Sequence, residues 1–188
     1  MIIEPCCINR QLPELMLREK QGVFFSNGDW GVKKLMEAIS YLADQDATVV
    51  LCMPSVDVYF CRTLANWLGR EWMKCVVLAT KEDCGEMVKN ELAGYEDRVL
   101  YMKRKNLAME AFVRYNQSHK FVVFGPMRVK GSGEFCQYSY VRGGSWEDFT
   151  ELVSPVVGLF VGKRKEGKKK CEEVRGFLER KFDVKVTG

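Results

Sequence analysis

His119 is the residue whose type most restricts the chemistry of this 188-residue chain, because it is the only histidine. Any acid–base catalysis by imidazole must pass through His119 or through its copy on a second subunit. A single histidine also excludes a Ser-His-Asp site elsewhere and a metal centre built from several histidines. The residue opens a strand-like run that ends at Gly125, so its chemistry depends on how that strand is placed.

Basic residues form the second group with chemical potential. Three of them, Lys103, Arg104 and Lys105, directly follow a predicted strand. Others lie nearby in sequence, namely Arg114, Lys120, Arg128 and Lys130. Together they predict a basic groove for nucleic acid or another phosphodiester polyanion. The interleaved tyrosines could stack bases there, at positions Tyr101, Tyr115, Tyr138 and Tyr140. The simpler interpretation is cations on exposed turns and tyrosines on half-buried strands.

The cysteines and glycines argue against metal and nucleotide chemistry. Of eight cysteines, Cys52 and Cys75 lie within apolar strands and are expected to be buried and reduced, as in an intracellular protein. No pair of C-x-x-C motifs offers a zinc site. The segment 28–31 lacks the spacing of a dinucleotide-binding loop, and no P-loop motif occurs. We therefore expect neither a metal nor a cofactor.

Composition indicates one compact unit with a basic end. The chain is 47% apolar with a formal net charge of +4, and the run 163–170 is strongly basic. We expect an N-terminal arm at 1–20, an α/β domain at 21–155, and a basic strap with an amphipathic helix at 156–188 that packs on the same domain. Neither a signal peptide nor a membrane-spanning run is evident, so a cytoplasmic location away from membranes is expected.

Hydrophobic periodicity predicts strands alternating with helices in the first half of the chain. Strands are expected at 22–26, 47–53, 73–79 and 98–102, and helices at 32–43, 56–69 and 82–93. The strand at 47–53 is continuously apolar, which predicts a central position covered on both faces. Thr80 is expected to cap the helix that follows it. This alternation is typical of a parallel sheet.

The second half changes pattern. Segments 108–115, 119–125 and 135–141 are strand-like with no helix between them, so they are expected to be antiparallel neighbours. Helical signals return at 145–152 and 171–182. The predicted fold class is therefore α/β, with a mixed sheet whose parallel βαβαβα half precedes antiparallel strands, and with helices on both faces.

This order of elements resembles the phospholipase D superfamily, in particular its short single-domain members. The segment Asn27-Gly28-Asp29-Trp30 is similar to the start of small phospholipase D-like proteins of phages and mobile elements. Asn27, Asp29 and Trp30 would then lie in a loop at the edge of the ligand site. The resemblance covers about residues 22–152. It implies an H-x-K pair on one strand, because residues two apart share a face and can hold one phosphate.

The chain can be placed on that motif in two ways. In the first, His119 is the nucleophile and Lys120 its companion, although adjacent strand residues point to opposite faces. In the second, which we prefer, the strand 109–113 takes the H-x-K position and 121–128 takes that of the family's glycine-serine segment. Met109 and Ala111 then replace the histidine and lysine. The second placement implies a catalytically degenerate domain.

Three functions follow as expectations. The first is a non-enzymatic phospholipase D-like module that binds nucleic acid or a protein partner. The second is a dimeric phosphodiesterase or nuclease that uses His119. The third is a purely structural or protein-interaction domain. A homodimer is an expected arrangement, since short family members pair to bring two sites together.

Overall fold

The fold is taken from a computed structural model. It describes residues 2–3, 11, 18, 21–27, 34, 47–105, 110–115, 120–128, 135–143 and 176. The predicted helices at 32–43, 145–152 and 171–182 and the basic strap lie outside the described residues, apart from isolated helical positions. The expected boundaries between the arm, the domain and the strap lie outside them as well.

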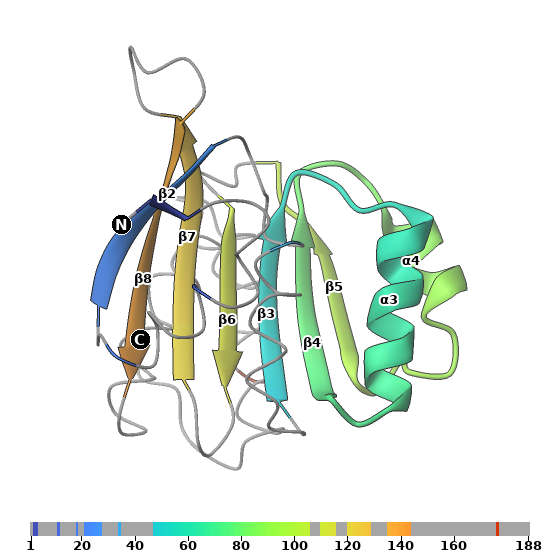
Figure 1. Cartoon of the computed structure of the whole chain (residues 1–188). Coiled ribbons are helices and arrows are strands. Elements are labelled where there is room, and N and C mark those ends of the chain that lie inside the picture. Colours follow the sequence, from blue (N-terminus) through green and yellow to red (C-terminus); the bar gives the residue numbers. More distant parts are fainter. Residues whose placement is uncertain are drawn as a thin grey trace.

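One mixed sheet of eight strands organises the described residues, in the order β1-β2-β8-β7-β6-β3-β4-β5 (Figure 1). The strands are β1 Ile2–Ile3, β2 Gln21–Asn27, β3 Ala47–Met53, β4 Met73–Thr80, β5 Val99–Lys103, β6 Ala111–Tyr115, β7 Lys120–Arg128 and β8 Phe135–Gly143. The predicted α/β class with a mixed sheet is therefore confirmed.

The two halves of the sheet differ in strand direction. β3, β4 and β5 are parallel, whereas β6, β7 and β8 are antiparallel to their neighbours, as the sequence predicts. The parallel half is narrower than expected, because β2 does not lie beside β3. β2 pairs along its whole length with β8 instead, from Gln21 opposite Val141 to Asn27 opposite Phe135. The alternation of strands and helices specifies directions but not which edge a strand joins.

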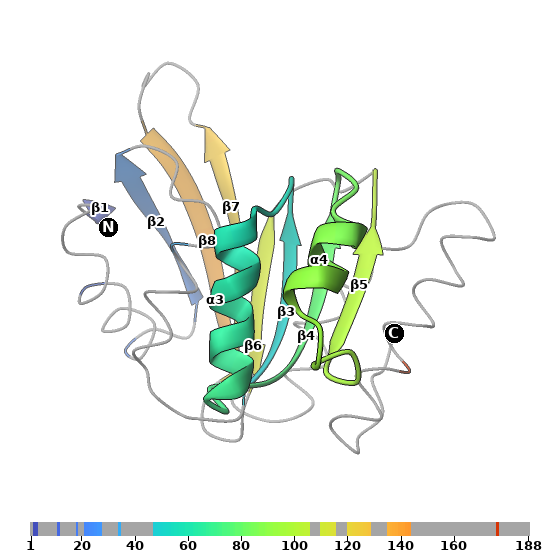
Figure 2. The same ribbon diagram turned by 90° about the vertical axis from the view of Figure 1, so that its right-hand side faces the viewer.

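Two helices connect the parallel strands and lie on one face of the sheet (Figure 2). α3, Val58–Gly69, joins β3 to β4, and α4, Gly85–Glu91, joins β4 to β5. Since both right-handed crossovers step in the same direction along the sheet, they place their helices on the same face. Cover of the opposite face by helices, also predicted, concerns segments outside the described residues.

α3 begins and ends where local chemistry requires. The Asp57 carboxylate accepts a hydrogen bond from the amide of Phe60 at 2.6 Å, which satisfies one of the free amides of the first turn. Gly69 is the last helical residue, as predicted, and Glu71 then takes a left-handed conformation with φ of 59°. The helix buries one face, made of Phe60, Cys61, Leu64, Trp67 and Leu68.

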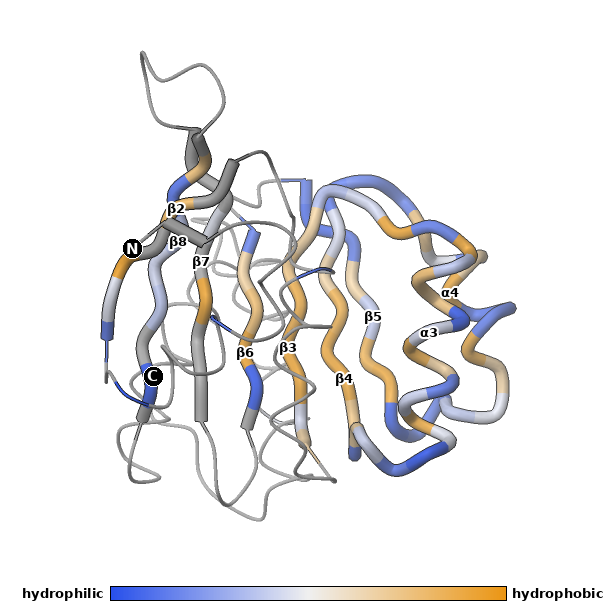
Figure 3. The backbone as a smooth tube through the Cα atoms, in the orientation of Figure 1, coloured by the Kyte–Doolittle hydropathy of each residue, from blue (hydrophilic) through white to orange (hydrophobic). Residues whose placement is uncertain are grey.

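The core lies between the sheet and these helices. Val49, Leu51 and Met53 of β3 form one cluster with the buried face of α3, and the cluster continues into the antiparallel strands through Phe112 and Val123. Every residue of β3 is buried, which confirms its predicted central position. Figure 3 shows the hydrophobic colouring running along β3 and β4, while the outer sides of the helices are hydrophilic.

The predicted burial of Cys52 and Cys75 is also confirmed, and both are free thiols. Cys75 Sγ lies 3.3 Å from the hydroxyl of Thr48. Within the described part of the chain, no helix is both long enough and apolar enough to cross a membrane.

Candidate functional site

The parallel strands end together at what we call the carboxyl edge of the sheet. Backbone hydrogen bonds join their connecting loops there. The amides of Lys81 and Glu82 donate to the carbonyls of Met53 and Pro54, at 3.2 and 3.0 Å. The amide of Arg104 donates to the carbonyl of Thr80 at 2.6 Å. Ligand sites of open α/β sheets gather at this edge, so it is the first place to examine.

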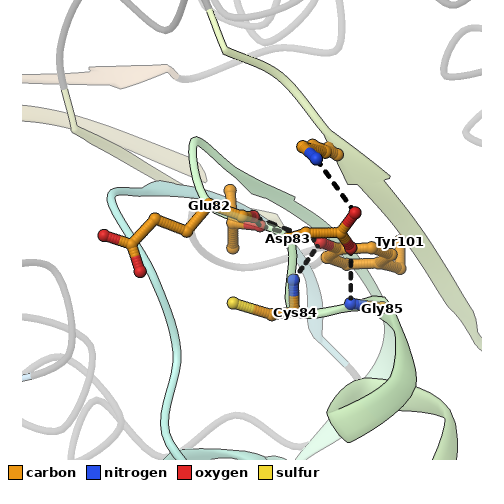
Figure 4. Close-up of polar contacts among 7 residues, drawn as sticks. Glu82, Asp83, Cys84, Gly85 and Tyr101 are labelled. Carbon is orange, nitrogen blue, oxygen red and sulfur yellow. Dashed lines mark hydrogen bonds and ion pairs between the residues drawn. The ribbon is translucent and has the colours of Figure 1, made fainter.

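Tyr101 fixes the loop between β4 and α4 at this edge (Figure 4). Its hydroxyl oxygen accepts from the amide of Cys84 at 2.8 Å and lies 3.0 Å from the hydroxyl of Thr80. Thr80 in turn donates to the carbonyl of Glu82 at 2.7 Å. Thr80 is therefore a buried strand residue that orders the loop, and the prediction that it caps the helix is wrong. α4 begins at Gly85, with Cys84 before it.

Lys103 is held by an acid of the same loop. Its ammonium group lies 2.9 Å from a carboxylate oxygen of Asp83, and the other carboxylate oxygen accepts from the amide of Gly85 at 3.2 Å. The hydrogen bond from Lys103 is the main reason that the pKa of Asp83 lies below its ordinary value, and the Gly85 bond adds to it. One of the three cations Lys103, Arg104 and Lys105 is thus already paired with an acid of the chain.

The charges of the carboxyl edge are nearly balanced among the described residues. Its cations are Lys81, Lys103, Arg104, Lys105 and Arg128, and its anions are Asp57, Glu82, Asp83 and Glu110. Lys81 and Lys105 are exposed, and Arg104 is half-buried. The edge therefore offers exposed cations within a surface of little net charge.

The predicted basic groove is not assembled as expected. Arg114 is only 5% exposed and lies inside the sheet, opposite Val49 of β3 and Phe121 of β7. Arg128 pairs with Cys136 at the end of β7, and its backbone lies at the carboxyl edge. Lys130 lies outside the described residues. Closeness in sequence did not predict closeness in space, because antiparallel strands place cations that are near in sequence at opposite ends of the sheet.

Lys120 shows this separation most clearly. It begins β7 opposite Tyr115, whose own partner in β3 is Thr48, so it lies at the edge where the parallel strands begin. β7 has nine residues, which places Lys120 about 26 Å from Arg128 along the strand at ~3.3 Å per residue. His119 itself lies outside the described residues. A site built on His119 and Lys120 would therefore not share an edge with Lys103, Arg104 and Lys105.

The loop after β2 is also distant from Lys103, Arg104 and Lys105. Asn27 ends β2 at the carboxyl edge, but β8, β7, β6, β3 and β4 separate it from β5. At ~4.8 Å per strand, this is about 29 Å along the sheet. Asp29 and Trp30 lie outside the described residues. Asn27 and Lys103 thus share an edge without sharing a site.

The buried tyrosines are not available to stack bases. Tyr138 is 0% exposed and Tyr140 is 1% exposed, and both belong to the core cluster. Tyr101 is committed to the loop described above. The exposed aromatic near the carboxyl edge is Tyr59, in the first turn of α3 and 75% exposed, which the sequence reasoning missed. Its position two residues after the helix cap, outside the apolar stripe, was the available signal.

A bulge interrupts the pairing of β7 with β8 near the carboxyl edge, beside the start of β6. The β7–β8 pairing shifts between Phe124 and Met127, and Gly125 has φ of 134°, a conformation largely restricted to glycine. Its amide donates to the carbonyl of Glu110 at 3.2 Å. A Cβ atom at Gly125 would lie 2.9 Å from the carbonyl oxygen of Gln137. Glycine followed by proline inside a strand pattern was the sequence signal for this bulge.

The described cysteines are not poised as nucleophiles. Burial raises the pKa of Cys52 to about 12 and is the main cause that raises the pKa of Cys61 to about 11, so both thiols stay protonated at neutral pH. In the part of the chain that is described, no group of three or more His, Cys, Asp or Glu residues is placed to hold a metal ion.

Comparison with known proteins returned no match among family models, curated proteins or solved structures. The case for any family therefore depends on the residues and on the topology.

Proposed function

We propose that this chain is a phospholipase D-like module that has lost its catalytic pair and binds nucleic acid through its carboxyl edge. The observation that carries the proposal is the junction of β6 and β7. These strands are direct neighbours, and their meeting point at Glu110 and Gly125 lies at the same edge as the ends of the parallel strands. This supports the placement in which 109–113 and 121–128 stand for the two family motifs.

The residues at that junction cannot perform the family's chemistry. Ala111 stands where the family carries lysine, and it is fully buried. An alanine methyl group neither attacks phosphorus nor stabilises a charged oxygen. Met109, at the histidine position, lies outside the described residues, but a thioether is not a general base. Binding without cleavage is therefore the function that we infer for this edge.

Exposed cations and one aromatic side chain support a polyanion as the ligand. Lys81 and Lys105 are exposed beside the half-buried Arg104, and Tyr59 offers an exposed ring near the start of α3. Cations that contact phosphates give affinity that falls with salt, and an aromatic ring can stack on a base. Asp83 and Glu82 reduce the local charge, so we expect modest affinity.

A binding experiment with matched charge changes tests this function. Nuclease-treated protein is titrated into labelled single-stranded DNA and RNA at about 50 and 200 mM salt, where even a few phosphate contacts change affinity severalfold. Arg104→Glu with Lys105→Glu should weaken binding by about tenfold or more. The control, Lys74→Glu with Lys89→Glu, makes the same net charge change on other exposed lysines and should have a smaller effect.

The charge balance of the edge favours a second candidate, a protein partner. A surface whose cations and anions are nearly equal in number suits a protein of mixed charge better than a polyanion. Absence of binding to DNA and RNA at low salt, or binding that salt does not weaken, would contradict the nucleic-acid proposal and favour this one.

The remaining candidate, a dimeric phosphodiesterase using His119, is less well supported. Lys120 lies at the edge opposite to Lys103 and Arg128. A site made of His119 and Lys120 would therefore act without the cations of the carboxyl edge. We expect no hydrolysis of a phosphodiester such as bis(p-nitrophenyl) phosphate. Hydrolysis that His119→Ala abolishes would overturn the non-catalytic proposal, because no other imidazole exists in the chain.

A further inference from the structure

β5 is the last strand of the sheet, and no strand in the described part of the chain pairs with its outer side (Figure 2). The carbonyl of Arg98 accepts from Val76, and the amide of Arg104 donates to Thr80, so these backbone groups face β4. Because strand residues alternate, Leu100 and Met102 also direct their amides and carbonyls toward β4. The backbone groups of Val99 and Tyr101 therefore point away from the sheet.

Within the described residues, this edge strand carries few of the usual devices that prevent strand pairing. Edge strands are commonly blocked by proline, by a bulge, or by shortness. The opposite end of the sheet has such protection, because β1 contains only two residues. β5 has five residues, no proline, and a pairing with β4 that runs without a bulge from Val99 to Lys103. Lys103, at its end, is the one charged residue within it.

The charges that flank β5 are arranged with opposite sign at its two ends. Glu96 and Asp97 lie in the turn that leads into the strand, and both are exposed. The Glu96 carboxylate accepts a hydrogen bond from the amide of Gly94 at 3.0 Å and keeps its negative charge at the surface. Arg104 and Lys105 follow it. A strand that is acidic at its start and basic at its end is complementary to itself when a second copy runs antiparallel, since each acidic end then meets a basic end.

We propose that β5 pairs antiparallel with β5 of a second copy of this chain, which joins two sheets into one continuous sheet. The two-fold axis passes beside Leu100. Val99 of each copy then exchanges both backbone hydrogen bonds with Tyr101 of the other. The acidic turn that carries Glu96 then lies beside Arg104 of the second copy, so opposite charges meet at each end of the paired strands.

The expected dimer is weak. A contact limited to one short strand and its flanks buries less than the roughly 1,200 Å² of a standard stable interface. We therefore expect a dissociation constant in the micromolar range or above. Lowering the salt concentration should decrease this dissociation constant, because the charged ends of the two strands are then less screened. This pairing does not depend on the proposed nucleic-acid binding, so the experiment uses protein freed of nucleic acid.

Charge exchange across the axis provides the test. Sedimentation velocity of the full chain from about 1 to 500 µM should show a concentration-dependent dimer. Glu96→Lys alone and Arg104→Glu alone should each raise the dissociation constant by about tenfold, because each places like charges opposite one another. An equimolar mixture of the two variants should regain dimer as a heterodimer, since the exchanged charges are again complementary. Circular dichroism confirms that each variant is folded.

Three outcomes would overturn the proposal: a monomer over the whole range, a dimer unaffected by either change, or a mixture that fails to regain association. Amide exchange of the unchanged protein gives a second measurement that needs no variant. The amides of Val99 and Tyr101 should exchange more slowly at high concentration than at low concentration. Equal exchange at both concentrations would also contradict pairing through β5.

Discussion

The ammonium group of Lys103, at the end of β5, lies 2.9 Å from the carboxylate of Asp83, in the loop before α4. This ion pair connects the end of β5 to the start of the crossover between β4 and β5, at the carboxyl edge. It also determines which cations of the basic run can act on a ligand, because Lys103 is engaged while Lys105 is exposed. We therefore expect Lys105 to contribute more to any polyanion binding than Lys103.

The Asp83 pair predicts a small stabilisation that depends on pH. The folded-state pKa of Asp83 is lowered, so its contribution is present above the ordinary value of 3.8 and is lost as the pH falls through the folded-state pKa. Asp83→Asn should lower the Tm at pH 7 by no more than about 3 °C, because the pair is exposed to solvent. The difference from the parent should disappear in thermal melts at acidic pH. A difference in Tm that stays the same from neutral to acidic pH would contradict this account.

Gly125→Ala should destabilise the fold strongly. The φ of 134° disfavours any side chain, and the new Cβ would lie 2.9 Å from the carbonyl oxygen of Gln137. We expect a loss of about 3 kcal/mol or more in urea unfolding. Gly94→Ala is the matched control, since its φ is 91° but nothing lies within 4 Å of the added atom. It should cost about 1 kcal/mol, and equal losses at both positions would contradict the steric explanation.

Tyr101→Phe should loosen the loop between β4 and α4. The change removes the hydroxyl that accepts from the amide of Cys84 and lies beside Thr80, leaving both groups without that partner. We expect a loss of about 1–2 kcal/mol in stability. Faster amide exchange at Cys84 and Gly85 would locate the effect. Tyr59→Phe, at a ring that is 75% exposed, should change stability by no more than about 0.5 kcal/mol.

Cys52 should resist modification until the protein unfolds. Burial raises its pKa from 9.0 to about 12, so the folded state holds the protonated thiol. Peptide mapping after iodoacetamide treatment at pH 8 should find Cys52 unlabelled in the native protein and labelled in guanidinium chloride. Native labelling as fast as that of the unfolded chain would show that the site is open to solvent.

The same shift predicts weaker stability at alkaline pH. The contribution of Cys52 is complete below pH 9.0 and is lost as the pH rises toward about 12, because the thiol ionises first in the unfolded chain. Between pH 8 and about 10.5, the free energy of unfolding in urea should decrease less for Cys52→Ala than for the parent protein, because the variant has no thiol to ionise at this position. An identical loss in both proteins would assign the alkaline effect to other groups.

The sequence alone determined the elements whose periodicity is strong. The continuous apolar run 47–53 became the fully buried β3, and the stripe through Phe60, Leu64 and Leu68 became the inner face of α3. The three strands after residue 110 also formed as antiparallel neighbours. These features are local, because side-chain alternation and turn residues specify them without reference to distant parts of the chain.

Only the tertiary structure decided which residues meet. Antiparallel reversal at the start of β7 sends Lys120 to the edge away from Arg128, and burial removes Arg114 from any exposed groove. The hydroxyl of Tyr101 reaches Thr80 across 21 residues of sequence because β4 and β5 are neighbours in register. Strand order arises from long-range pairing, which leaves no periodic trace in the sequence. The candidate site was therefore the part least predictable from the chain itself.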